Sequence, residues 1–166
     1  MSLESLHALV AQLTAEGYHS VYLERLKTHL GEVGEESTEP KSDGDRDTPG
    51  PTPRKRRASD HEWVEAELRG EMASSLGRAG ARVDAVLLEL ELLARAVQTK
   101  AGEDRSAAIL RHNERRQEAL EARRDLIVQR EALGIRDNSG VVDHYPVPSP
   151  IGPDGEHLPT PPYEVD

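Results

Sequence analysis

Seven histidines are the side chains best suited to chemistry in this chain, since imidazole serves both as a general base and as a metal ligand. They stand at positions 7, 19, 29, 61, 112, 144 and 157. No two are four residues apart, the spacing that places two imidazoles on one helix face to bind zinc. His112 also lacks a second histidine at this spacing. Because Glu114 and Arg115 follow it, it is expected to make a surface hydrogen bond. The histidines therefore predict no metal site.

Other patterns of catalysis are also missing from the sequence. It contains no HExxH, GxSxG, phosphate loop or GxGxxG, and no cysteine that could act as a nucleophile or form a disulfide. With no sheet expected and little core to wall a pocket, we expect no catalytic residues, no cofactor and no small-molecule ligand. The sequence thus favours a non-catalytic protein.

A run of four consecutive cations is the most specific local signal. Arg54, Lys55, Arg56 and Arg57 follow a strongly acidic stretch. Such a basic cluster is typical of a nuclear import signal or of a docking site for an acidic partner. A solvated charge run is the alternative, and the sequence leaves both open.

Two hydroxyl side chains flank this basic cluster as possible phosphorylation sites. Thr52 precedes a proline, as in sites of proline-directed kinases, and Ser59 follows two arginines, as in sites of basophilic kinases. Ser59 also has capping-box spacing to Glu62, which predicts that a helix begins there. A phosphate on Ser59 would lie at a helix N-terminus, where the helix dipole favours negative charge.

Composition limits the partners of the chain. Its 166 residues carry 21 basic and 31 acidic side chains, a formal net charge of −10. An acidic protein of this kind is disfavoured at nucleic acids and at anionic membranes. No apolar stretch approaches the roughly 18 residues of a membrane span, and the N-terminus lacks the features of a signal peptide. We therefore expect an intracellular protein, nuclear or cytoplasmic, without membrane contact.

The element that must organise the fold is a long apolar seam. Residues at alternating steps of three and four form it: Met72, Leu76, Ala79, Val83, Val86, Leu90, Leu93 and Val97. This heptad spacing predicts a helix from residue 59 to about 101, weakened or bent near Gly77 and Gly80. After a short connection, Asp104 is expected to cap a last helix that ends at Gly134. Residues 59–135 should thus form a long antiparallel helical hairpin.

The seam is broader than one neighbouring helix would cover. The predicted helix interface consists of Met72, Leu76, Val83, Val86, Leu87, Leu90, Leu93, Val97, Leu120 and Ile127. The returning helix has no Val, Ile, Leu or Met between positions 111 and 118, so a third helix is expected. The N-terminal residues, a second copy of the chain or a different protein could supply it.

The remaining segments are shorter or poorer in apolar residues. Residues 1–31 predict a small helical hairpin with a left-handed stop at Gly17, a cap at Ser20 and an end at Gly31. Residues 32–58 read as a disordered acidic linker that contains the basic cluster. Residues 136–166 hold seven prolines and predict a flexible tail without helix.

Two further features offer alternative partners. The last helix carries eight arginines between residues 103 and 136, but seven acidic residues interrupt them and no aromatic side chain is interleaved, so nucleic-acid binding is disfavoured. The terminal Glu164-Val165-Asp166 resembles the terminus that cytosolic chaperones present to tetratricopeptide clamps, although Tyr163 replaces their preceding acidic residue.

The sequence as a whole predicts an all-α, elongated, coiled-coil-like protein. Its most favoured function is that of an adaptor or structural subunit, which binds partner proteins or itself through helix packing of residues 59–135. A nucleic-acid-associated nuclear factor and a ligand of tetratricopeptide clamps are the alternatives.

Overall fold

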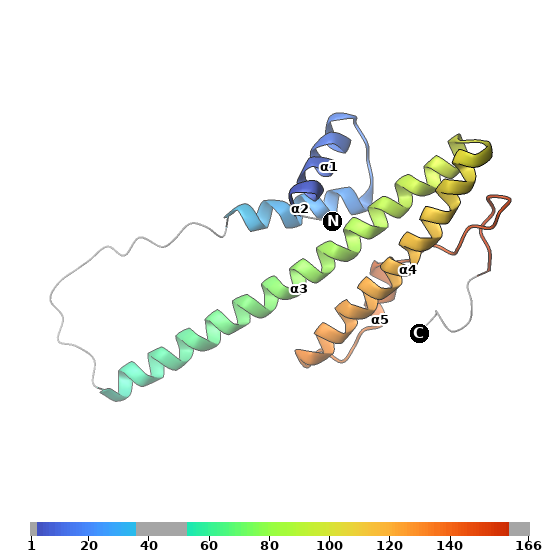
Figure 1. The fold of residues 1–166 in the computed structure, drawn as a ribbon. Helices are drawn as coiled ribbons and strands as arrows, with labels where there is room; N and C mark the ends of the chain where they lie inside the picture. Colours follow the sequence, from blue (N-terminus) through green and yellow to red (C-terminus); the bar gives the residue numbers. More distant parts are fainter. Residues whose placement is uncertain (1–2, 36–52, 160–166) are drawn as a thin grey trace.

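A computed structural model describes residues 3–35 and 53–159 of the chain. Five helices follow one another: α1 (Leu3–Ala15), α2 (Val21–Glu35), α3 (Pro53–Thr99), α4 (Gly102–Ala132) and α5 (Ser139–His144). Helix α4 folds back antiparallel along α3, and α1 and α2 lie against the other side of α3 (Figure 1). The described residues contain no strand, which confirms the prediction of an all-α, elongated helical hairpin.

The seam between α3 and α4 pairs large side chains with small ones. Val83, Leu87 and Leu90 of α3 are buried against Ala119 and Ala122 of α4, and Leu126 completes this cluster. Alanines let the two helix backbones approach closely, so the large side chains of α3 fill the space between them. Between positions 111 and 118, where α4 has no apolar side chain, the buried residues that it presents are His112 and Arg116.

The N-terminal hairpin supplies the third helix that the seam requires. Gly17 adopts a positive φ of 70° between α1 and α2, as predicted for a left-handed helix stop. Buried leucines of both helices, among them Leu23 and Leu26, pack on Ala85 and Leu88 of α3. Of the three predicted sources of a third helix, the chain itself provides one.

Several predicted helix ends differ from the structure. Helix α2 continues through Gly31 to Glu35, because one glycine inside a helix costs only about 1 kcal/mol relative to alanine. Helix α3 begins at Pro53, so Ser59 lies inside it and is not its cap. Proline suits the first turn of a helix, where its missing N–H has no intrahelical partner.

The predicted cap of the last helix and the predicted bend of the long helix are also wrong. Helix α4 begins at Gly102 after Ala101, so Asp104 lies inside its first turn and does not cap it. Helix α3 runs as one helix across Gly77 and Gly80. The packing of α3 on its neighbours offsets the low helix propensity of these glycines. The predicted stop at Gly134 is confirmed by its φ of 83°.

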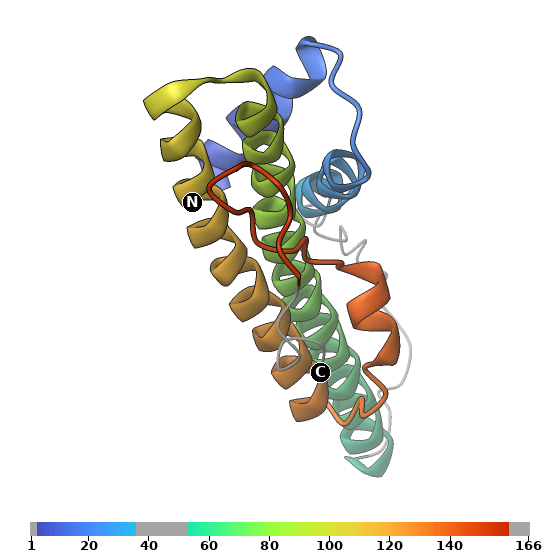
Figure 2. The same ribbon diagram turned by 90° about the vertical axis from the view of Figure 1, so that its right-hand side faces the viewer.

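The C-terminal segment is packed, and the prediction of a flexible, helix-free tail is wrong for its described part. Helix α5 buries Val141 against the α3–α4 seam. Beyond it, residues 145–158, here called the C-terminal strap, lie against the two long helices, and Ile151 is buried there beside Val97 and Ile109 (Figure 2). Prolines prevent a long helix in the strap, but they do not prevent an extended segment from docking.

Polar groups of α4 hold this strap. Arg123, Arg116 and Arg105 donate hydrogen bonds to the carbonyls of Tyr145, Pro148 and Asp154 at 3.5, 2.7 and 2.9 Å. Because the order is reversed along the chain, the strap runs antiparallel to α4. Proline-rich backbone offers acceptors but few donors, so donor-only arginine side chains are its natural partners.

Helix α3 is longer than α4, and its N-terminal half extends beyond the end of α4 (Figure 1). Along the described residues, no helix combines the length and the apolar character that crossing a membrane requires.

Candidate functional site

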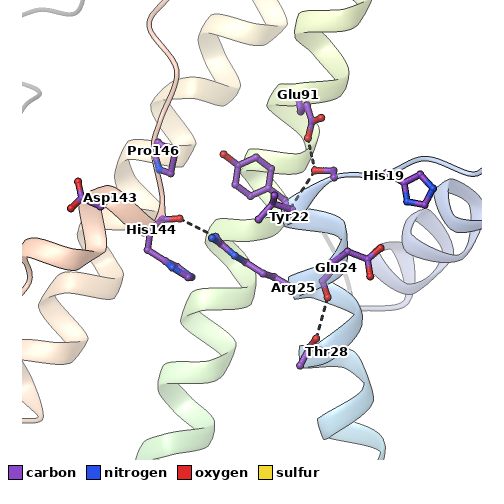
Figure 3. Close-up of a pocket in the computed structure, with 11 residues that line it drawn as sticks. His19, Tyr22, Glu24, Arg25, Thr28, Glu91, Asp143, His144 and Pro146 are labelled. Atoms are coloured by element: carbon purple, nitrogen blue, oxygen red, sulfur yellow. Dashed lines mark hydrogen bonds between the residues drawn. The ribbon is translucent and has the colours of Figure 1, made fainter.

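An open groove of about 960 Å³ lies between α2, α3 and the segment around α5 (Figure 3). The start of α2 forms one wall, and Glu91 of α3 and the turn after α5 form the others. Its lining residues are His19, Ser20, Val21, Tyr22, Glu24, Arg25, Thr28, Glu91, Asp143, His144 and Pro146. The groove thus combines several ionisable side chains from elements far apart in the sequence.

Arg25 lies at the centre of this groove, and its contacts join separate elements of the fold. Its Nη1 donates to Oδ1 of Asp84 at 3.2 Å and to the carbonyl oxygen of His144 at 2.9 Å. Its guanidinium also lies 5.9 Å from the ring centre of Tyr22 and 5.6 Å from that of Tyr145. One side chain of α2 therefore binds both α3 and the segment that follows α5.

Asp84, the partner of Arg25, is fully buried. Burial raises the pKa of its carboxyl above the usual value, against the opposing effect of Arg25. His29 of α2 adds a second contact, with its Nε2 3.8 Å from Oδ2 of Asp84. A buried carboxylate of this kind needs its partners, so the three side chains fix the N-terminal hairpin on α3.

Ser20 makes two hydrogen bonds at the start of α2. Its Oγ accepts a hydrogen bond from the backbone N–H of Tyr22 at 3.3 Å, which confirms the predicted cap of α2. The same Oγ donates to Oε2 of Glu91 at 2.5 Å. In Figure 3 the ring of His19 lies away from Glu91. Among the described residues no group of His, Asp or Glu is arranged to hold a metal ion.

A second candidate site is the part of α3 that extends beyond α4. We call residues 62–71 the α3 projection. It carries three large apolar side chains in solvent: Trp63, Val64 and Leu68, with 66%, 55% and 54% of their surface exposed. Val64 and Leu68 are four residues apart and therefore neighbours on one helix face, and Met72, half-buried, is the next residue in that row.

The structure uses most of the predicted helix interface inside the chain. Val83, Leu87, Leu90 and Val97 are buried, and the others that pack around them are Leu76, Val86 and Ile127. Leu93 and Leu120 are half-buried. Seven of the ten predicted interface residues are therefore buried or packed within the described chain. The α3 projection was not among the predicted interface residues.

The predicted basic cluster and phosphorylation sites lie at the edge of what the structure describes. Arg54, Lys55, Arg56, Arg57 and Ser59 belong to the first turns of α3, where only the helix itself is described. Thr52 lies outside the described residues, as do the three C-terminal residues that resemble a chaperone terminus. Their predicted roles stay predictions.

The sequence analysis missed the polar residues of α4 that bind the strap. His112 is not on the surface but fully buried, and burial lowers the pKa of its imidazole. Its neighbour Asn113 pairs with Ile151 through two hydrogen bonds. The seven-residue spacing of Arg116, Arg123 and Arg130 was the available signal, because it places three arginines on one face of α4. No protein-family model, no curated protein and no solved structure matches this chain.

Proposed function

We propose that this protein is a non-catalytic adaptor or structural subunit that binds a partner protein by helix packing on the α3 projection. The observation that supports this proposal is the exposure of Trp63, Val64 and Leu68 on a helix that runs past its own packing partner. Large apolar side chains grouped in solvent are a feature of interaction surfaces. The polar groups around Arg25 hold the N-terminal hairpin on α3, which gives them a structural role in an adaptor protein.

The proposal moves the interaction surface from the predicted interface, which comprised residues 72–97 with Leu120 and Ile127, to residues 62–71. Since the predicted residues pack within the chain, a substitution there would damage the fold itself. Leu90, for example, is buried against α4, and placing a charge there would cost several kcal/mol of folding stability.

A pair of matched substitutions tests this function. Leu68→Asp removes the centre of the α3 projection, whereas Leu110→Asp places the same charge at an equally exposed leucine of α4, where 61% of the surface is accessible. Proteins retained from a cell extract by the full chain should be lost with Leu68→Asp and kept with Leu110→Asp. Equal retention by both variants, with unchanged circular dichroism, would contradict the proposal.

The alternative of nucleic-acid binding receives less support. Arg116 and Arg123 of the arginine-rich helix are buried against the strap, and Arg115 lies 2.7 Å from Glu89. Arginines engaged in this way do not offer a free basic face. We further propose an intracellular location, nuclear or cytoplasmic, with the basic cluster as import signal. Replacing its four cations by alanine in a reporter fusion should then abolish nuclear accumulation.

A further inference from the structure

The α3 projection is strongly acidic as well as apolar. Four exposed glutamates lie on it: Glu62, Glu65, Glu67 and Glu71. Arg69 is the one cation in these ten residues, and its Nη2 pairs with Oε2 of Glu65 at 3.0 Å. In a helix with about 100° per residue, Glu67 and Glu71 lie on one side of Val64 and Leu68, and Glu65 lies on the other. The apolar row is thus bordered by Glu67 and Glu71 on one side and by the Glu65–Arg69 ion pair on the other.

This apolar row turns away from the seam that α3 forms with α4. Leu76, Met72, Leu68 and Val64 follow one another at steps of four, and each step rotates the row by about 40° around α3, whereas the seam keeps its direction by alternating steps of three and four. Helix α4 ends at Ala132, beside the middle of α3, so its packing does not reach the α3 projection (Figure 1). The shape that fits the row is a second helix packed on the face of Val64 and Leu68.

A second copy of the chain does not suit this position. Two α3 projections paired in either orientation would bring their glutamates together along the whole contact. Like charges facing each other across a helix interface oppose pairing. The chain's own arginine-rich helix, α4, already packs along another part of α3. The two ends of the chain carry acidic residues, so they do not complement the glutamates of the α3 projection.

We propose that the α3 projection binds a basic amphipathic helix of another protein, with an apolar stripe bordered by Lys and Arg. The stripe covers Val64, Leu68 and Met72, and the cations lie against Glu67 and Glu71. This inference rests on the proposed function, because it names the partner of the same surface.

The protein carries its own reporter for this test. Trp63 is its one tryptophan, is exposed, and precedes Val64 with Glu67 as its neighbour four residues along the helix surface. The full chain is titrated with two synthetic helical peptides that share one leucine stripe, with lysines beside the stripe in the first peptide and glutamates in the second. We expect the lysine peptide to shift Trp63 emission to shorter wavelength, and the glutamate peptide to leave it unchanged. The affinity for the lysine peptide should decrease with added salt.

Two variants locate the contact and test its charge. Leu68→Asp should weaken binding of the lysine peptide at least about tenfold, equivalent to 1.4 kcal/mol, whereas Leu110→Asp should leave it unchanged. Reversing three charges together, with Glu65→Lys, Glu67→Lys and Glu71→Lys, should transfer the preference to the glutamate peptide.

Other results would overturn the inference and are distinguishable from failure of the proposed function. Equal binding of both peptides, or binding of neither while Leu68→Asp still loses partners from extract, would reject the basic partner but keep the adaptor surface. Self-association in sedimentation that Leu68→Asp abolishes would identify a second copy as the occupant. If Leu68→Asp changes neither peptide binding nor retention of partners, both proposals fail.

Discussion

Replacing Asn113 by alanine should release the C-terminal strap at its buried centre. The amide Nδ2 of Asn113 donates to the carbonyl oxygen of Ile151 at 2.8 Å, and its Oδ1 accepts from the N–H of Ile151 at 2.9 Å. One side chain therefore replaces both hydrogen bonds that a neighbouring strand would give to this residue. Removing it leaves two backbone groups of a buried residue without these partners.

The expected loss follows from these two bonds. Each contributes about 0.5–1.5 kcal/mol to stability, so their sum is about 1–3 kcal/mol. Alanine has a higher helix propensity than asparagine, which stabilises the variant by about 0.5 kcal/mol. Asn113→Ala should therefore lower the free energy of unfolding by about 0.5–2.5 kcal/mol, measured by urea titration followed by circular dichroism.

Gln117→Ala is the matched control, because Gln117 is exposed one turn further along α4. It makes a similar gain in helix propensity without touching the strap, so it should be neutral or slightly stabilising. Hydrogen exchange adds a local measurement, since the amide of Ile151 should exchange faster in Asn113→Ala alone. If both variants unfold at the same urea concentration and the Ile151 amide stays protected, the strap is not held as the contacts indicate.

Three further predictions concern buried groups. Burial lowers the pKa of His112, so its contribution to stability is complete above about pH 6.5 and is lost as the pH falls through the lowered pKa. His112→Leu should remove this acid-dependent loss in thermal unfolding measured from pH 7.5 to 5. Burial raises the pKa of Asp84, so its contribution is complete below about pH 3.9 and is lost as the pH rises through the raised pKa. Asp84→Asn should therefore gain stability relative to the original protein as the pH rises from 4 to 7, and a constant difference would refute this. A Cβ at position 80 would lie 2.8 Å from the hydroxyl of Tyr145, whereas one at position 77 meets nothing within 4 Å. Gly77→Ala should thus stabilise by up to about 1 kcal/mol, and Gly80→Ala should be less stable than Gly77→Ala in the same urea titration.

The part of the fold that sequence predicts well is the part with long periodic signals. The seam from Met72 to Val97 predicted a helix and its antiparallel partner, because large apolar residues at steps of three and four leave little choice of structure. Gly17 and Gly134 were also predicted, since each has the positive φ that glycine adopts easily.

The docking of the strap could not be predicted in the same way, because it depends on prolines in the strap and on arginines in α4, which lie far apart in the sequence. Prolines in residues 145–158 indicated that this segment forms no helix, which holds for it, but they did not indicate the surface on which it lies. The arginines of α4 resembled a solvated charged face, because their partners are carbonyl oxygens, which every sequence has. Only the folded chain shows that Arg116 and Pro148, 32 residues apart, form a pair.

The candidate site shows the opposite limit of sequence reasoning. A helix with a broad apolar face is expected to pack against another element. Whether that element belongs to the same chain or to another protein depends on how other segments dock, and few residues determine this docking. The N-terminal hairpin docks on α3 through Leu23, Leu26 and the Arg25–Asp84 pair, and this docking covers the broad apolar face at residues 81–92. What remains exposed is the α3 projection, whose two spaced apolar residues form too short a pattern to detect in advance.

This division of α3 bears on how the α3 projection binds. An isolated helix of that length would be marginal in water, because nucleating a helix is unfavourable. Here α4, the hairpin and the strap hold the C-terminal half of α3 in helical form, so the projection only extends a helix that already exists. A partner that meets a formed helix needs to order less of this chain on binding, and more of the contact energy becomes affinity. In the proposed function, the packed half of the molecule thus supports binding at Val64 and Leu68 without touching the partner.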